Sequence, residues 1–256
     1  MHYLVGPLTF VLLLWLGMLL LLEIGRRIGV RQRKASEGAG SGFGAVEGAV
    51  FGLLGLLIAF TFSGAAARFE TRRNLVVEET NDIGTAYLRL SLLPQDAQPE
   101  LHDLFRQYVD ARLAFYHEIL DPEAAQARMA RLRELQNEIW PRAVKASQQT
   151  STTVASMLLL PALNNMFDIA TTRSAAQQMH PPKVIFGMLA VLALACSLLA
   201  GYGMSASPRS WLHTIAFAVI LTLAVYLIID LEYPRAGVIR LSSFDQILID
   251  LRNSMK

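Results

Sequence analysis

The sequence has few charged residues and a single cysteine. Charged residues make up 17% of the 256 residues, whereas hydrophobic residues make up 53%. This composition is too apolar for an ordinary soluble domain and is typical of a membrane protein. Cys196 has no second cysteine with which to form a disulfide in the chain, so it does not indicate a redox compartment. The net charge of +2 comes without a block of like charges, which argues against a nucleic-acid-binding tail.

Catalytic signatures and strand-like alternation are also lacking. The sequence contains no H-E-x-x-H, Walker, G-x-S-x-G or paired C-x-x-C motif. His102 and His117 are too far apart along the chain to share one metal ion by ordinary ligand spacing. We therefore expect a protein that is not an enzyme and that has neither a cofactor nor a metal site.

Long apolar runs, in contrast, are abundant. Four of them approach or exceed the length needed to cross a bilayer as a helix, which is about 20 residues. The first run could be a signal peptide, but no lysine or arginine precedes it and no A-x-A cleavage site follows it, so a retained span is favoured. The predicted spans cover about residues 7–24, 45–67, 184–203 and 211–230.

The polar segment between the second and third spans, residues 68–182, is predicted to be helical. Apolar residues recur in it at helical spacing, and no strand-like alternation interrupts them. One helix is predicted to begin with Asp121 as its N-cap and Pro122 in its first position, and to be interrupted at Pro141. Pro161 is predicted to kink a later helix.

The second span is predicted to continue beyond the membrane as a long helix, because no breaker follows it until Gly84 and Pro94. The expected fold is an all-α membrane protein with four transmembrane helices and a membrane-proximal helical bundle inserted between spans two and three. The predicted parts are a transmembrane hairpin over 1–67 with a basic loop at 26–34, an extramembrane helical bundle over 68–182, a second transmembrane hairpin over 183–232, and a C-terminal tail over 233–256.

The loop after the first span is strongly basic, with Arg26, Arg27, Arg31, Arg33 and Lys34. The positive-inside rule places this loop in the cytoplasm, and alternation then places the N-terminus, the bundle and the C-terminus outside. Basic residues at the opposite ends of the spans favour the reverse orientation. We favour the first orientation because the first helix usually dominates. The opposing residues are Arg68, Arg72, Arg73, Lys183, Arg235 and Arg240.

Polar residues near the start of the second span and between the second and third spans are candidates for an ion pathway. Glu78 and Asp82 are four residues apart and share a helix face, as expected of an acid–base pair, a cation site or two solvated acids. Straight helices would bring Arg173 to the height of Glu78 or Glu79, so the alternatives are an ion pair and unrelated surface charges. The candidate pathway residues are Glu47, Glu78, Glu79, Asn81, Asp82, Asn165, Asp168 and Arg173.

The second span carries a stripe of small residues. Lipid supplies no hydrophobic drive for helix pairing, so small residues that permit close backbone approach indicate tight helix packing. This packing could lie within the chain or between subunits, and the first alternative is favoured. Glu47 is interpreted either as an ion site or as an anchor paired with Arg26 or Arg27. The stripe consists of Gly44, Gly48, Gly52, Gly55, Ala59, Ser63 and Ala66.

Three segments carry a resemblance to a known family. They read GAVEGAVFGLLGLLIAFTFSGAAARFETRRNLVVEETNDIGTAYLRLSLLP, PPKVIFGMLAVLALACSLLAGYG and IIDLEYPRAGVIRL. They resemble the bestrophin-like domain family of bacterial membrane proteins, and the resemblance extends over nearly the whole chain. It implies a location in the bacterial inner membrane and a distant similarity to bestrophins. Bestrophins are oligomeric helical anion channels with four spans and a large domain between spans two and three.

Two features depart from the bestrophin plan. The basic loop places the large domain outside the cell, whereas bestrophins keep it in the cytoplasm. The small-residue face of the second span also offers no aromatic gate at equivalent spacing. No bestrophin pore residue is therefore carried over to this chain.

The sequence and the resemblance together predict a homo-oligomeric ion channel, a tetramer or a pentamer. Its expected partners are the lipid bilayer and small inorganic ions, and not nucleic acid. The resemblance implies anions, whereas the acids Glu47, Glu78, Glu79 and Asp82 would favour cations if they lined a pore. The alternative is a membrane sensor or accessory protein whose helical domain binds a partner or a ligand.

Overall fold

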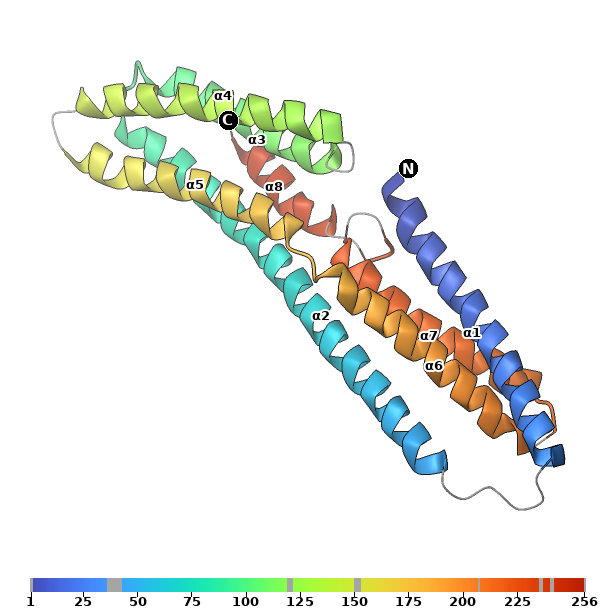
Figure 1. Cartoon of the computed structure of the whole chain (residues 1–256). Helices are drawn as coiled ribbons and strands as arrows, with labels where there is room; N and C mark the ends of the chain where they lie inside the picture. The colour runs from blue at the N-terminus through green and yellow to red at the C-terminus, as the bar shows by residue number, and fades with distance from the viewer. Residues whose placement is uncertain are drawn as a thin grey trace. The chain divides into compact units, whose positions relative to one another are not determined.

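The described part of the chain is built from α-helices and short 3₁₀ turns, without strands, which confirms the all-α fold class (Figure 1). The computed structural model describes residues 2–35, 43–118, 122–149, 153–206, 208–234, 237–239 and 242–255. The elements are α1 (His2–Ala35), α2 (Phe43–Arg89), η1 (Leu90–Leu92), α3 (Gln98–Glu118), α4 (Pro122–Gln148), α5 (Val154–Gln178), α6 (Lys183–Gly203), η2 (Met204–Ala206), α7 (Trp211–Glu232) and α8 (Ser242–Ser254).

The chain divides into two compact units. The first comprises Met1–Phe69 and His180–Ile239, and the second comprises Glu70–Met179 and Arg240–Lys256. Helix α2 contributes to both, because it is continuous through Phe69 and Glu70.

The first unit is a bundle of apolar helices formed by α1, the start of α2, α6 and α7. Four helices in the described part of the chain are long and apolar enough to cross a membrane, which confirms the predicted number of spans. The buried core of this unit includes Met18, Leu54 and Val225. Its outer surface remains apolar, with Leu20 61% exposed and Ile220 65% exposed, as lipid contact requires.

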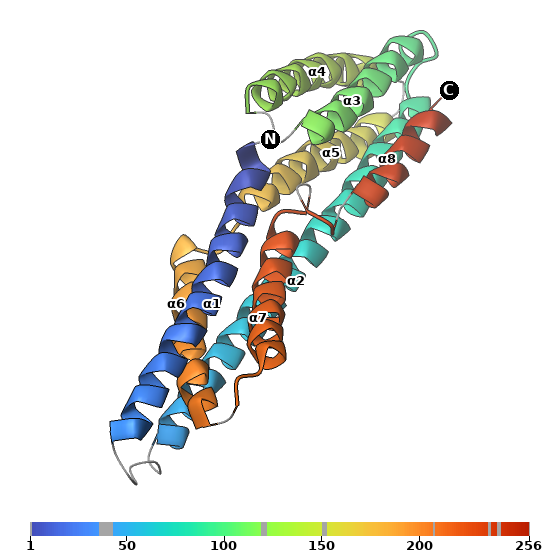
Figure 2. The same ribbon diagram turned by 90° about the vertical axis from the view of Figure 1, so that its right-hand side faces the viewer.

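The closest helix pair in this unit is α1 with α6, which lie side by side in both views (Figures 1 and 2). Glycine makes this approach possible. A Cβ atom on Gly25 would lie 2.0 Å from the carbonyl oxygen of Leu198, and one on Gly201 would lie 2.0 Å from that of Leu22. The small residues that hold the spans of one chain together are therefore on α1 and α6.

The turn after α7 is organised by Asp230. Its buried carboxylate accepts hydrogen bonds from the backbone N–H groups of Val238, at 2.9 Å, and Ile239, at 2.8 Å. A Cβ atom on Gly237 would lie 1.4 Å from Asp230 Oδ1, so only glycine leaves room for the carboxylate. Asp230 thus closes the turn that follows α7. Arg235 lies outside the described residues.

The second unit is a helical bundle with its own core. It comprises the end of α2 with α3, α4, α5 and α8. Fully buried side chains from α2, α3 and α4 meet in this core, among them Ile83, Phe105 and Leu135. Leu248 of α8 and Met255, which follows this helix, join the core, so the residues assigned to a tail from the sequence supply part of it.

Two proline predictions have different outcomes. Helix α4 begins at Pro122, as predicted, although Asp121 lies outside the described residues. The predicted interruption at Pro141 is wrong, because α4 continues to Gln148. Ile139 and Ala143, on either side of this proline, are fully buried in the core, and this burial offsets the lost backbone hydrogen bond. Helix α5 also continues through Pro161, and the kink expected there stays a prediction.

Candidate functional site

Helix α2 carries most of the candidate residues. It extends over 47 residues from Phe43 to Arg89, as predicted for a span that continues as a long helix. Gly84 lies within it, and the helix ends before Pro94 through the 3₁₀ turn Leu90–Leu92.

The small-residue stripe of α2 is exposed. All its members except the half-buried Ala66 lie on the surface of the chain. A Cβ atom on Gly44, Gly48, Gly52 or Gly55 would have no other atom within 4 Å. The favoured interpretation, that these glycines pack within the chain, is therefore wrong. Since α1 and α6 already use their own glycines for close approach, the stripe is left open to another molecule.

A different face of α2 holds it in the first unit. Leu54 and Ala65 are buried there. Phe51 packs edge-on against Phe217 of α7 with ring centroids 6.3 Å apart, and the Cys196 thiol of α6 lies 3.8 Å from the carbonyl oxygen of Val50. Residues of this face attach α2 to its own chain, while the stripe of small residues faces outward.

The exposed face continues along α2 with polar side chains in place of small ones. After Ala66, the same spacing of three or four residues leads to five exposed polar residues, namely two acids, two amides and one hydroxyl. The five are Glu70, Asn74, Glu78, Asn81 and Thr85. One face of this helix is therefore small and apolar in its first half and polar and acidic in its second half.

The predicted pathway residues separate into two groups. Glu78 and Asn81 on α2 and Asn165 and Asp168 on α5 are exposed, and Asp82 is half-buried. Glu79 and Arg173, in contrast, are buried and joined by an ion pair, which is one of the two pairs considered from the sequence.

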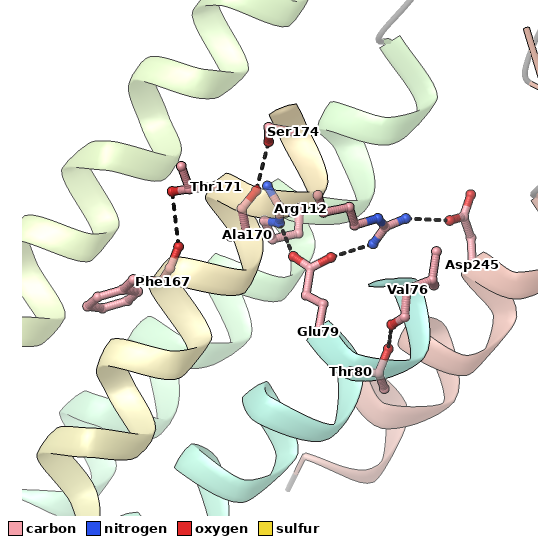
Figure 3. Close-up of polar contacts among 10 residues, drawn as sticks. Val76, Glu79, Thr80, Arg112, Phe167, Ala170, Thr171, Ser174 and Asp245 are labelled. Carbon is pink, nitrogen blue, oxygen red and sulfur yellow. Dashed lines mark hydrogen bonds and ion pairs between the residues drawn. The ribbon is translucent and has the colours of Figure 1, made fainter. Parts of the chain in front are cut away.

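Glu79 is the centre of a buried charge network in the second unit. Its carboxylate accepts hydrogen bonds from Arg112 of α3 and Arg173 of α5. The Arg173 guanidinium also lies 3.3 Å from Asp245 of α8. Figure 3 shows Glu79 and Asp245 approaching from different helices, with Arg112 on the far side of Glu79. The network thus connects α2, α3, α5 and α8.

The charges of this network compensate one another. Two carboxylates and two guanidinium groups, each at most 2% exposed, provide the opposite charge that a buried ion requires. Tyr108 lies beside them, and burial raises the pKa of its phenol to about 12 although the Arg112 charge opposes this shift. An arrangement of this kind fixes helices in place and has no surplus charge with which to hold an ion.

Arg112 and Asp245 did not appear among the predicted residues. A signal for both exists in the sequence, because each lies in register with buried apolar positions: Arg112 follows Tyr108 by four residues, and Asp245 precedes Leu248 by three. A charged residue on the apolar face of a helix indicates a buried partner.

Acids in the first unit have separate environments. Glu232 accepts a hydrogen bond from Arg68 at 2.7 Å, and its other oxygen lies 3.5 Å from His180. Glu47 is half-buried, and one of its oxygens would be 3.8 Å from a Cβ atom on Gly203. The anchor interpretation of Glu47 fails for the described residues, because no ion pair joins it to Arg26 or Arg27.

Within the part of the chain that the structure describes, no group of three or more His, Cys, Asp and Glu residues could hold a metal ion.

The four spans and the inserted bundle define a class of helical membrane proteins. The Bestrophin-like domain matches residues 11–244, and the chain therefore belongs to the bestrophin-like family. This match confirms the resemblance found in the three sequence segments. No curated protein matches the chain.

A solved structure shares the fold. It is a mutant of a bacterial bestrophin homologue from Klebsiella pneumoniae, with a TM-score of 0.66 and 14% sequence identity. The alignment covers 93% of this chain and 98% of that chain. At this identity the likeness concerns the fold, so individual residues of the two proteins are not equated.

Proposed function

We propose that the protein is a homo-oligomeric ion channel of bestrophin-like type, a tetramer or pentamer in the bacterial inner membrane. The observation that carries this proposal is the open stripe of α2 between Gly44 and Ala66. Small residues with nothing against them in their own chain suit close contact between copies of a spanning helix. Membership of the bestrophin-like family supports the same function.

The proposed pathway follows the exposed face of α2. Its first half brings copies of the helix together around a central axis, and its second half lines a vestibule with Glu78, Asn81 and Asp82. The exposed Asn165 and Asp168 of α5 are further candidates for the vestibule. Rings of acidic side chains favour cations, so the charge of this face favours cation conduction, whereas the family resemblance favours anions. Reversal potentials in unequal salt solutions distinguish the two.

The buried residues of the predicted pathway have a supporting role in this proposal. Glu79 and Arg173 fix α2 against α5, so that the exposed acids on α2 keep a defined orientation. Glu47 lies at the start of the stripe and is the acid closest along α2 to the proposed helix contact.

Replacing Gly52 by leucine is expected to lower ion flux into liposomes by at least about tenfold, because the added side chain occupies either the helix contact or the pore. Native mass spectrometry in mild detergent separates the two, since loss of the oligomer indicates a contact and retention indicates a pore lining. Gly187 of α6 is a matched control, because it is also exposed with nothing within 4 Å of its Cβ position. A wild-type protein that is monomeric and gives no flux would contradict the proposal and favour a sensor or accessory protein.

The orientation proposed from the basic loop has its own test. A cysteine introduced at Arg33 is expected to stay unlabelled when intact cells are treated with a membrane-impermeant maleimide, because the loop lies in the cytoplasm. Cys196 is buried and serves as an internal background. Labelling in intact cells would reverse the assignment and place the helical bundle inside the cell.

A further inference from the structure

A cavity lies at the end of the first unit where α6 ends and α7 begins. It has a volume of about 220 Å³ and is lined by Arg26, Met204, Pro208, Ser210 and His213. A smaller cavity of about 10 Å³ shares Arg26 and Met204 and reaches Arg209 and Trp211. The larger cavity is several times the volume of a liquid water molecule, about 30 Å³, and so has room for a compact polyatomic ion. None of these residues belongs to the proposed ion pathway.

The charge around this cavity is unbalanced. Glu23 lines the smaller cavity, and its carboxylate accepts hydrogen bonds from Arg27 at 2.8 Å and from Arg209 at 3.0 Å. The half-buried guanidinium of Arg26 has no hydrogen bond and no ion pair among the described residues. Among the described residues, Arg26, Arg27 and Arg209 lie around Glu23, and Arg26, which lines both cavities, is the one of the three that makes no ion pair with it. A guanidinium with five free donors in a cavity suits an oxyanion.

The other polar groups of the larger cavity are a hydroxyl and an imidazole. Ser210 Oγ lies 2.7 Å from His213 Nδ1. In the tautomer in which Ser210 donates to Nδ1, the Nε2 atom carries a proton and can donate to an anion. None of the described residues that line the larger cavity is an acid, and the Glu23 carboxylate beside it is already paired with two arginines, so an entering anion would meet hydrogen-bond donors.

The surroundings are those of a membrane–water interface. Trp211 is 59% exposed and Leu212 is 76% exposed at the start of the apolar helix α7. The Arg209 guanidinium lies 4.0 Å from the centre of the Trp211 ring. Exposed tryptophan next to basic residues at the end of a span is typical of the headgroup level of a bilayer.

We propose that this cavity binds the phosphate group of an anionic phospholipid, with Arg26 as its main ligand. Ser210 and His213 supply further hydrogen bonds, and the acyl chains lie along the exposed apolar start of α7. The chemistry that the site recognises is a phosphate oxyanion, and the apolar surface beside it favours a lipid over free phosphate as the source.

The test measures lipid binding to the purified full-length protein by native mass spectrometry in detergent. The probes are dioleoylphosphatidylglycerol and the zwitterionic dioleoylphosphatidylcholine. Wild-type protein is expected to bind the first lipid saturably, and Arg26→Gln to weaken this binding by about tenfold, the size expected for one charge-assisted contact. Arg33→Gln is the matched control, because it removes the same charge from an exposed position of α1 outside both cavities.

Three outcomes decide between the possibilities. Weaker lipid binding in Arg26→Gln, with unchanged binding in Arg33→Gln, supports the site. Displacement of the lipid by millimolar inorganic phosphate would show that free phosphate is also a ligand. Equal losses in Arg26→Gln and Arg33→Gln would overturn the proposal, since they indicate general attraction to a basic surface. If Arg26→Gln lowers the melting temperature of the protein, lipid binding is compared instead for Arg26→Lys and His213→Asn. Binding is measured without ion flux, so this result stands or fails separately from the channel function.

Discussion

Replacing Glu79 by glutamine is expected to lower the free energy of unfolding of the helical bundle by about 3–5 kcal/mol, the range observed when one partner of a buried ion pair is removed. Glu79 is fully buried and accepts hydrogen bonds from both Arg112 and Arg173. Its neutral amide would remove one of the two buried carboxylates that balance the Arg112 and Arg173 guanidinium groups, and Asp245 would be the carboxylate that remains. The remaining positive charge is what makes the substitution costly.

The neighbouring acid provides the control. Glu78→Gln removes the same charge from the same helix, but Glu78 is exposed, so its free energy of unfolding should change by less than about 0.5 kcal/mol. Urea titrations in mild detergent can follow Trp140, which is the only tryptophan of the second unit, after Trp15 and Trp211 have been replaced by phenylalanine. Equal effects of the two substitutions would mean that the buried network does not stabilise the bundle.

Replacing Gly201 by valine is expected to destabilise the first unit by about 3 kcal/mol or more, at the upper end of the cost of overpacking. A Cβ atom at this position would lie 2.0 Å from the carbonyl oxygen of Leu22, and the obstacle is backbone that cannot rotate away. Helices α1 and α6 would have to separate, which would also disturb the approach of Gly25 to Leu198. The measurement is the melting temperature of the detergent-solubilised protein, followed by size-exclusion chromatography after heating.

Gly187 again provides the comparison, because it lies on the same helix with open space at its Cβ position. Gly187→Val should leave the melting temperature nearly unchanged, because the added side chain meets open space and valine is no poorer a helix former than glycine. A Gly201→Val protein with the melting temperature of the Gly187→Val protein would show that α1 and α6 can move apart at little cost. That outcome would contradict the tight contact between these two helices.

Local patterns in the sequence were sufficient for the helices and the spans. The long apolar runs, the absence of alternation and the uninterrupted stretch after the second span predicted four spanning helices and the length of α2. These features depend on residues close together in the chain, so they can be inferred without knowing what each helix contacts. Pro141 shows the limit of this inference, because the buried residues on either side of it override a local signal for a helix end.

The roles of the charged residues could not be predicted from local sequence patterns. Glu78 and Glu79 are adjacent and identical, yet the first is exposed and the second is fully buried. Successive helical residues point about 100° apart, so the rotation of α2 about its own axis decides which of the two glutamates is buried. Only the positions of Arg112 on α3 and Arg173 on α5 determine which of the two glutamates is the centre of the network.

The sequence by itself determined that this is an all-α, four-span membrane protein of the bestrophin-like family, because hydrophobic length and family segments are properties of the linear chain. The tertiary structure decided which small residues meet. A glycine permits close approach but does not select its partner, and the partner lies far away in the sequence. Gly25 and Gly201 therefore hold α1 against α6, whereas the longer stripe on α2 remains open at the surface of the chain.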